Sequence, residues 1–166
     1  MYIIDYLSFN RSAIKRGESS EMRIRGFKKS DVYYLVEILK LNGQYEYPAI
    51  EGPDAMNEVA NCEAAVFLVA EVKGKPCGFI KAVYDGSRAI IHLLSVHPDY
   101  QRRGIGSTLV DAVCTELFHR GAPTVSATVT EQSVGFWEKK GFRRTNALIV
   151  LREDLKKISA ASPNNR

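Results

Sequence analysis

The chain has 166 residues, of which 45% are hydrophobic and 25% are charged, a composition typical of an ordinary soluble globular domain. Lys and Arg outnumber Asp and Glu by 23 to 19, which gives a net charge of +4. The excess is small, and the sequence has no run of five or six basic residues, so nucleic-acid binding is not expected. No stretch approaches the roughly 20 apolar residues that span a bilayer, so no membrane partner is expected either.

The three cysteines exclude two further classes. Cys62, Cys77 and Cys114 are far apart, odd in number and form no Cys-x-x-Cys pair, which argues against a disulfide framework and a zinc site. The histidines add no metal-ligand pattern, and we expect no metal. The opening "MYIIDYLSF" contains Asp5 and lacks both a basic leader and a cleavage site, so it is not a secretory signal. These features predict a cytoplasmic protein.

The first half of the chain predicts a helical segment followed by strands. Residues 1–21 include the polar "RSAIKRGESSE" and are expected to form an accessory arm, with the domain beginning at a strand from Met22. A helix with Ser30 as its N-cap and Asp31 in its first turn is expected from the spacing of the apolar residues that follow, and Gly43 ends it. A short helix is expected at about 54–61. Two hairpin strands, "AAVFLVAEV" and "CGFIKAVYD", precede a third, "AIIHLLSV", that ends at Val96.

The second half predicts alternating helices and strands. A helix from Ile105 to Arg120 has apolar residues four apart. The strand "TVSATVT", the helix "EQSVGFWEKK" and a final strand or hairpin in "FRRTNALIVLRED" follow. We expect one domain over residues 22–152 and a disordered tail over 153–166. This order predicts a mixed α/β sheet with helices packed on its faces.

One loop joins a predicted strand to a predicted helix and carries two arginines and two glycines. A helix start has unpaired N–H groups and a partial positive charge, and it is a ready site for phosphate. The segment is not a Walker loop, and Leu109 stands where a dinucleotide fingerprint needs its third glycine. The alternative is a tight turn with solvated arginines. The candidate phosphate-binding residues are Gln101, Arg102, Arg103, Gly104, Ile105, Gly106, Ser107 and Thr108.

Two segments resemble motifs of one family. "LLSVHPDYQRRGIGSTLVDAV" is similar to the acyl-CoA signature of the GNAT superfamily of N-acetyltransferases: a strand ending in Val-x-Pro, then Gln/Arg-x-x-Gly-x-Gly/Ala and a helix. "FWEKKGFRR", from Phe136 to Arg144, resembles the second motif, Phe-Tyr-x-x-x-Gly-Phe. The resemblance covers about residues 22–152. It implies an α/β (α+β) fold with a mostly antiparallel central sheet, a splayed strand pair and helices on both faces.

The resemblance also implies a reaction and a way of holding acetyl-CoA, the expected cosubstrate. The amides of residues 101–106 would hold the CoA pyrophosphate, and the strand ending at Val96 would pair with the pantetheine arm. Leu94 would contribute its backbone, and the Val96 N–H would polarise the thioester carbonyl. The implied activity is transfer of an acetyl group from acetyl-CoA to a primary amine, of a small molecule or a protein, by direct attack.

The attacking amine must lose a proton, because an unperturbed lysine-like amine titrates near pH ~10.4. Relatives often carry a Glu on the strand that ends at Val96, and the stretch Ala89–Val96 has no carboxylate. His92 is the titratable residue there and is the candidate general base. Glu131 and Tyr84 are weaker candidates. The alternative for His92 is a packed or surface residue.

The sequence differs from the family pattern at two positions. Trp137 occupies the position where many relatives have a Tyr that acts as general acid, and an indole cannot donate a proton in this way. A thiol with a pKa of ~8.5 can leave as thiolate, so the acid is helpful rather than obligatory. Trp137 is therefore expected to pack beside the pantetheine arm. The second difference is Thr130, which stands where an Asn often contacts the cofactor. Cys114 is expected to be a core residue.

Several alternatives stay open. The missing Tyr and Glu leave room for a non-catalytic acyl-CoA-binding sensor, and the basic excess for a nucleic-acid-associated protein. The acceptor would be chosen by residues 40–64 and the loop around 85–88. Aromatic and acidic residues in the first of these segments hint at a cationic amine: Tyr45, Glu46, Tyr47 and Glu51. The apolar start of the chain could support a homodimer.

Overall fold

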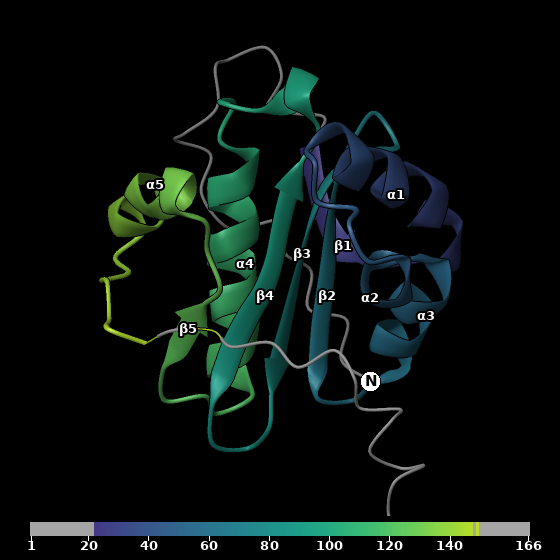
Figure 1. Cartoon of the computed structure of the whole chain (residues 1–166). Helices are drawn as coiled ribbons and strands as arrows, with labels where there is room; N and C mark the ends of the chain where they lie inside the picture. Colours follow the sequence, from purple (N-terminus) through teal and green to yellow (C-terminus); the bar gives the residue numbers. More distant parts are fainter. Residues whose placement is uncertain (1–21, 148, 150–166) are drawn as a thin grey trace, which may run out of the picture.

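A five-stranded sheet forms the centre of the computed structural model, which describes residues 22–147 and 149 (Figure 1). The strands stand in the order β1-β2-β3-β4-β5. Neighbouring strands from β1 to β4 are antiparallel, whereas β4 and β5 are parallel. The predicted mixed, mostly antiparallel sheet is confirmed. The strands are β1 Met22–Gly26, β2 Ala65–Val72, β3 Lys75–Tyr84, β4 Ala89–Val96 and β5 Val125–Ala127.

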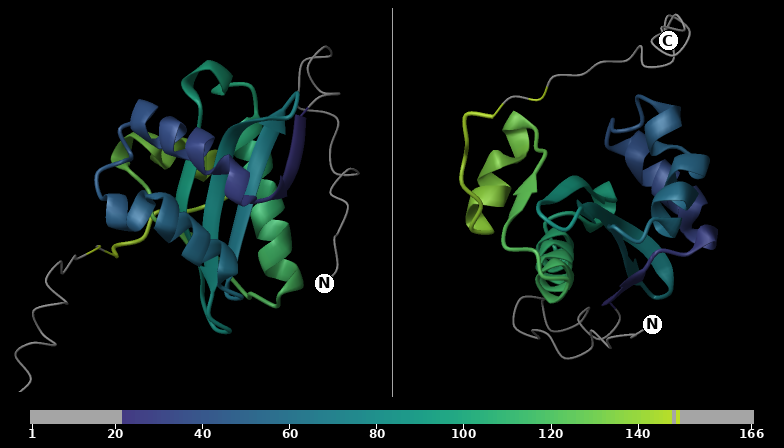
Figure 2. Two further views of the ribbon diagram at one scale, coloured as in Figure 1. Left: turned by 90° about the vertical axis from the view of Figure 1, so that its right-hand side faces the viewer. Right: turned by 90° about the horizontal axis from the view of Figure 1, so that it is seen from below.

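Helices cover both faces of this sheet, as predicted (Figures 1 and 2). One face carries α1 (Val32–Leu41), α2 (Pro48–Glu51) and α3 (Pro53–Asn61). The opposite face carries α4 (Ile105–His119), and α5 (Val134–Lys139) lies beside it. Lys140, which follows α5, forms an ion pair with Asp111 of α4. None of the described helices is long and apolar enough to cross a bilayer.

Each face of the sheet has its own apolar core because side chains alternate between the two faces along a strand. On the α4 face, Ile80 and Ile91 pack with Leu109 and Val113. On the α1 face, Phe67, Val69 and Phe79 pack with α1 and α3, in a cluster completed by Leu35, Ile38, Leu39 and Met56. Strand β3 is buried on both sides from Cys77 to Ala82, as a central strand must be.

Strands β4 and β5 separate partway along β4. Their pairing covers only Ala89–Ile91, and Thr128 donates the last backbone bond to the Ile91 carbonyl at 3.0 Å. Strand β4 continues to Val96 with one edge open. Against β3, Lys81 pairs with Leu93 and Ala82 with Ile91, so that His92 is an extra residue in a β-bulge. The splayed strand pair is confirmed.

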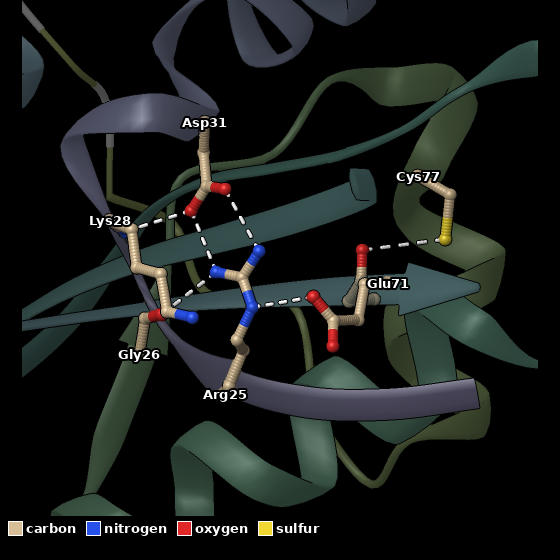
Figure 3. A network of polar contacts seen from close by, with 7 residues as sticks. Arg25, Gly26, Lys28, Asp31, Glu71 and Cys77 are labelled. Atoms are coloured by element: carbon tan, nitrogen blue, oxygen red, sulfur yellow. Dashed lines mark hydrogen bonds and ion pairs between the residues drawn. The ribbon is translucent and has the colours of Figure 1, made fainter. Parts of the chain in front are cut away.

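A buried cation fastens β1 to its neighbours (Figure 3). The Arg25 guanidinium donates two hydrogen bonds to Asp31, at 2.7 and 2.8 Å, and one to Glu71 of β2 at 2.6 Å. The Asp31 carboxylate also accepts from the Lys28 amide at 2.8 Å. The two carboxylates raise the pKa of Arg25 beyond its usual value even though burial opposes this. The network therefore holds the start of α1 against the sheet edge.

Some predicted elements differ from the structure. No strand forms over residues 142–147, so the predicted final strand or hairpin is wrong for that stretch, and Leu148 and residues 150–154 lie outside the described residues. Strand β5 is three residues long, shorter than "TVSATVT", because pairing stops where the strands separate. The four-residue helix α2 was not predicted. The expected arm (1–21) and tail (153–166) also lie outside the described residues.

Candidate active site

The loop Gln101–Gly104 leads directly into the first turn of α4, as the sequence predicted. Gly104 is the N-cap, with a left-handed φ of +85°, and Arg102 also has a positive φ of +60°. Thr108 donates its amide to the Gly104 carbonyl at 3.0 Å and so closes the first helical turn. The amides of Ile105, Gly106 and Ser107 precede that bond and have no intrahelical acceptor. Amides in this arrangement at the start of a helix can bind an anion.

Some side chains of the loop and the first helical turn are exposed, and others make hydrogen bonds within the turn. Arg102 and Arg103 are exposed, and the Arg103 guanidinium lies 5.4 Å from the centre of the Tyr100 ring. The Thr108 hydroxyl donates to the Gly104 carbonyl at 3.1 Å, so it supports the helix start. Ser107 is half-buried in the same turn. The loop can thus offer backbone amides and the positive charges of Arg102 and Arg103 to a phosphate.

The open edge of β4 presents backbone groups next to this loop. The His97 amide donates to Cys77 of β3 at 2.8 Å, and antiparallel partners alternate between facing each other and facing away. The backbone groups of Leu94 and Val96 therefore point to the open edge. A ligand with amide groups could extend the sheet here by pairing with them.

Side chains from the end of α1 bind the carbonyls on that edge. Asn42 donates to the Val96 carbonyl at 2.9 Å, and Gln44 donates to the Leu94 carbonyl at 3.4 Å. Gln101 donates to the Val96 carbonyl at 3.0 Å and to the Asn42 side chain at 3.1 Å. With these carbonyls engaged, the amides of the two strand residues remain as the donors on the edge.

Ser95 completes this network from the other side of the strand. It is 2% exposed, and its hydroxyl accepts from Asn42 at 2.8 Å and donates to Gln44 at 2.6 Å. Sequence reasoning missed Asn42, Gln44 and Ser95 because these partners are 51 and 53 residues apart. Polar residues just after a predicted helix were the one available signal.

The two motifs meet in space. A Cβ atom built on Gly106 would lie 3.6 Å from the Phe136 ring and 3.8 Å from Val96, so α5 and β4 both pack against the first turn of α4. Trp137 is 5% exposed and makes edge contacts with Phe136 and Phe142, at ring-centre distances of 5.4 and 5.1 Å. Phe136 contacts the first turn of α4, whereas Trp137 belongs to the core on the α4 face.

The candidate bases lie on different elements. His92 is exposed at the bulge of β4, and its pKa is lowered from the usual 6.5, first by partial burial of the ring and then by the positive charge of Lys81. The Glu131 side chain is 80% exposed and pairs with Arg144 at 3.2 Å. The Tyr84 hydroxyl donates to the carbonyls of two turn glycines, Gly86 and Gly121. Of these residues, His92 lies on the strand with the open edge.

Over residues 22–147, no group of three or more His, Cys, Asp or Glu side chains is arranged to hold a metal ion. An open depression of about 510 Å³ lies beside the loop after α1. It is lined by Lys40, Gly43, Tyr45 and Glu46. It belongs to the segment expected to vary with the acceptor.

A sheet with one splayed edge, donor amides along that edge and an anion-binding helix start beside it define an acyl-CoA-dependent acyltransferase. Residues 33–142 match the model of the acetyltransferase (GNAT) family. The chain belongs to this family, and acetyl-CoA is its cosubstrate. The resemblance seen in the sequence is confirmed.

Several solved structures share this fold. A transcriptional regulator from Bacillus halodurans aligns with a TM-score of 0.69 and 21% identity over 80% of this chain and 99% of its own. The PaiA N-acetyltransferase from Thermoplasma acidophilum, in complex with coenzyme A, aligns with a TM-score of 0.68 and 21% identity over 76% and 92%. The Trypanosoma brucei acetyltransferase aligns with a TM-score of 0.65 and 22% identity over 80% and 100%.

Proposed function

We propose that this protein transfers the acetyl group of acetyl-CoA to a primary amine by direct attack of the amine on the thioester. The observation that carries the proposal is the open edge of β4 next to the first turn of α4. Leu94 and Val96 direct their amides to that edge, while the amides of Ile105–Ser107 have no intrahelical acceptor. This arrangement suits a ligand with a pyrophosphate at one end and amides along its length.

The residues have distinct roles in this proposal. The first turn of α4 binds the pyrophosphate, and Arg102 and Arg103 add positive charge beside it. The backbone of Leu94 and Val96 pairs with the pantetheine arm. The Val96 amide donates to the thioester oxygen, where negative charge develops as the amine attacks. Trp137 and Phe136 hold α5 against α4 and so shape the edge of this site.

His92 is the group that we propose takes the proton of the amine. It lies on the strand that carries the donor amides, and its lowered pKa keeps the imidazole neutral at pH 7. Glu131 is a less suitable base because its carboxylate is exposed and paired with Arg144. The thiolate of CoA leaves without a tyrosine acid, since the residue at that position is a buried tryptophan.

The first test places a negative charge where the pyrophosphate would bind. In Gly106→Glu the new carboxylate is compatible with a helix N-terminus but repels phosphate. Gly135→Glu is the matched control, because Gly135 is also a helical glycine and nothing lies within 4 Å of its Cβ position. Acetyl-CoA at millimolar concentration should raise the melting temperature of the wild type and the control, but not of Gly106→Glu. Unchanged melting of the wild type would refute the proposal.

Turnover is then measured with a set of amines by the release of free CoA thiol. His92→Gln should lower kcat by roughly 100-fold or more, the usual contribution of a general base, and leave acetyl-CoA binding intact. Glu131→Gln should change kcat by less than about twofold. The opposite pattern would assign the base to Glu131 instead.

A further inference from the structure

A lysine lies almost completely buried in the middle of the central strand. Lys81 of β3 is 7% exposed, and burial lowers its pKa, with nearby Glu51 opposing the effect. Among residues 22–147 and 149, it makes no hydrogen bond or ion pair. Because the stem is covered, the ammonium group is held at one place near the sheet, and an unpaired cation held in this way is a candidate for a functional site.

The neighbours of Lys81 place its side chain on the α1 face of the sheet. Its cross-strand partners are Phe67 of β2 and Leu93 of β4, and both pack with the apolar cluster under α1 and α3. These apolar groups cover the aliphatic stem. No fully buried side-chain nitrogen or oxygen of the described residues lacks a partner, so the ammonium end of Lys81 reaches solvent.

The nearby carboxylate of Glu51 has a hydrogen-bond donor on its own helix. It accepts a hydrogen bond of 3.0 Å from the Tyr47 amide at the start of its own helix, α2. The second titratable neighbour is His92, whose pKa is lowered first by partial burial and then by the positive charge of Lys81. The ammonium group of Lys81 is therefore partly compensated at a distance and not paired, which leaves it able to bind an anion.

This lysine lies close to the open edge. Adjacent strands are about 4.8 Å apart and each residue adds about 3.3 Å, so the Lys81 Cα lies about 6 Å from that of Leu94. The α4 face of this edge is filled by side chains that include those of Leu94, Val96 and Phe136. The α1 face offers Lys81, Leu93 and the bulge at His92. An acceptor that reaches the thioester can therefore be recognised from the α1 face.

We propose that Lys81 binds an anionic group of the acceptor, so that the preferred substrate is an amine that also carries a carboxylate. The proposal rests on the function given above and names its substrate class. It adds a carboxylate to the amine acceptor that the acidic and aromatic residues after α1 suggest. Lys81 acts as a specificity residue, because its ammonium binds a part of the substrate that does not react.

The test uses ω-amino acids with one to five methylene groups and their primary amides, which differ only in charge. Wild type should prefer the acids, with the best spacer length showing the distance between the two binding groups. Lys81→Met keeps the volume and the apolar stem. It should lower kcat/KM for the acids by roughly 10- to 100-fold and change that for the amides by less than twofold. Lys75→Met, at the exposed end of the same strand, is the matched control and should keep the preference.

Binding to the complex with CoA provides a second readout that needs no turnover. The best acid should raise the melting temperature of the wild-type CoA complex further, but not that of Lys81→Met. A wild type without preference for acids, or an equal loss for acids and amides in Lys81→Met, would overturn the assignment of Lys81 and leave acetyl transfer standing. If CoA itself fails to stabilise the wild type, the proposed function fails first, and the inference falls with it.

Discussion

The side-chain amide of Asn42, one residue after α1, donates a hydrogen bond of 2.9 Å to the carbonyl of Val96, the last residue of β4. The same Asn42 accepts from Gln101, which donates to the same carbonyl. One asparagine thus connects α1, the open strand edge and the loop before α4. These contacts fix the position of the Val96 carbonyl relative to the loop before α4.

We therefore expect Asn42→Ala to weaken acetyl-CoA binding by roughly 5- to 10-fold, since one or two hydrogen bonds that orient the edge are lost. Isothermal titration calorimetry measures this change directly. Asn57→Ala is the control, because Asn57 donates only to the Pro53 carbonyl within α3. Equal affinity of Asn42→Ala and wild type would show that the network does not position the site.

The Arg25 network predicts a difference in stability. Removing a carboxylate from a buried ion pair leaves the cation with less compensation, so Asp31→Ala should lower the free energy of unfolding by about 3 kcal/mol. Glu37→Ala is the control, because Glu37 pairs with Lys40 at the surface, and its loss should cost less than about 0.5 kcal/mol. Urea denaturation of both variants tests the contrast. Similar losses in the two would refute it.

Thiol chemistry should separate the three cysteines. Burial raises the pKa of Cys77 to about 12, and its thiol donates to the Ala70 carbonyl at 3.4 Å. Burial also raises the pKa of Cys114, whereas Cys62 is exposed. At pH 8 an aromatic disulfide reagent should modify Cys62 rapidly and Cys77 only after unfolding, as mass spectrometry of the labelled peptides would show. Rapid labelling of Cys77 in the native protein would contradict its position in the core.

The pKa of His92 is expected to lie below 6.5, chiefly because of partial burial and secondly because of Lys81. A lowered folded-state pKa means that the native protein binds this proton less readily than the unfolded chain. The unfolded chain therefore takes up this proton at a higher pH than the native protein does, so the contribution of His92 to stability decreases as the pH falls through 6.5. NMR titration of the imidazole C–H signals measures the value.

In Lys81→Met the pKa of His92 should rise, because the positive charge of Lys81 is removed while the partial burial of the ring remains. Lys75→Met should leave it unchanged. A His92 pKa that does not respond to Lys81→Met would mean that the two groups do not interact, and it would weaken the description of the α1 face as one recognition surface.

Local features of the sequence predicted much of this site. The helix from Ile105, the loop before it and the strand ending at Val96 were all expected from apolar spacing and from glycines next to a helix start. These features depend on residues close together in the chain. The second motif, from Phe136 to Arg144, could likewise be recognised from its own residues, although Trp137 proved to be a core residue.

Other features depend on residues far apart. The sequence by itself determined the mixed sheet, the glycine-containing loop at the start of a helix and the family, because periodicity, turn residues and motif spacing are properties of short segments. Only the tertiary structure decided that the stem of Lys81 is buried, that Asn42 and Ser95 share a network, and that the amides of β4 remain open. Strand pairing, bulges and burial arise when distant segments pack, and no short segment of the sequence contains that information.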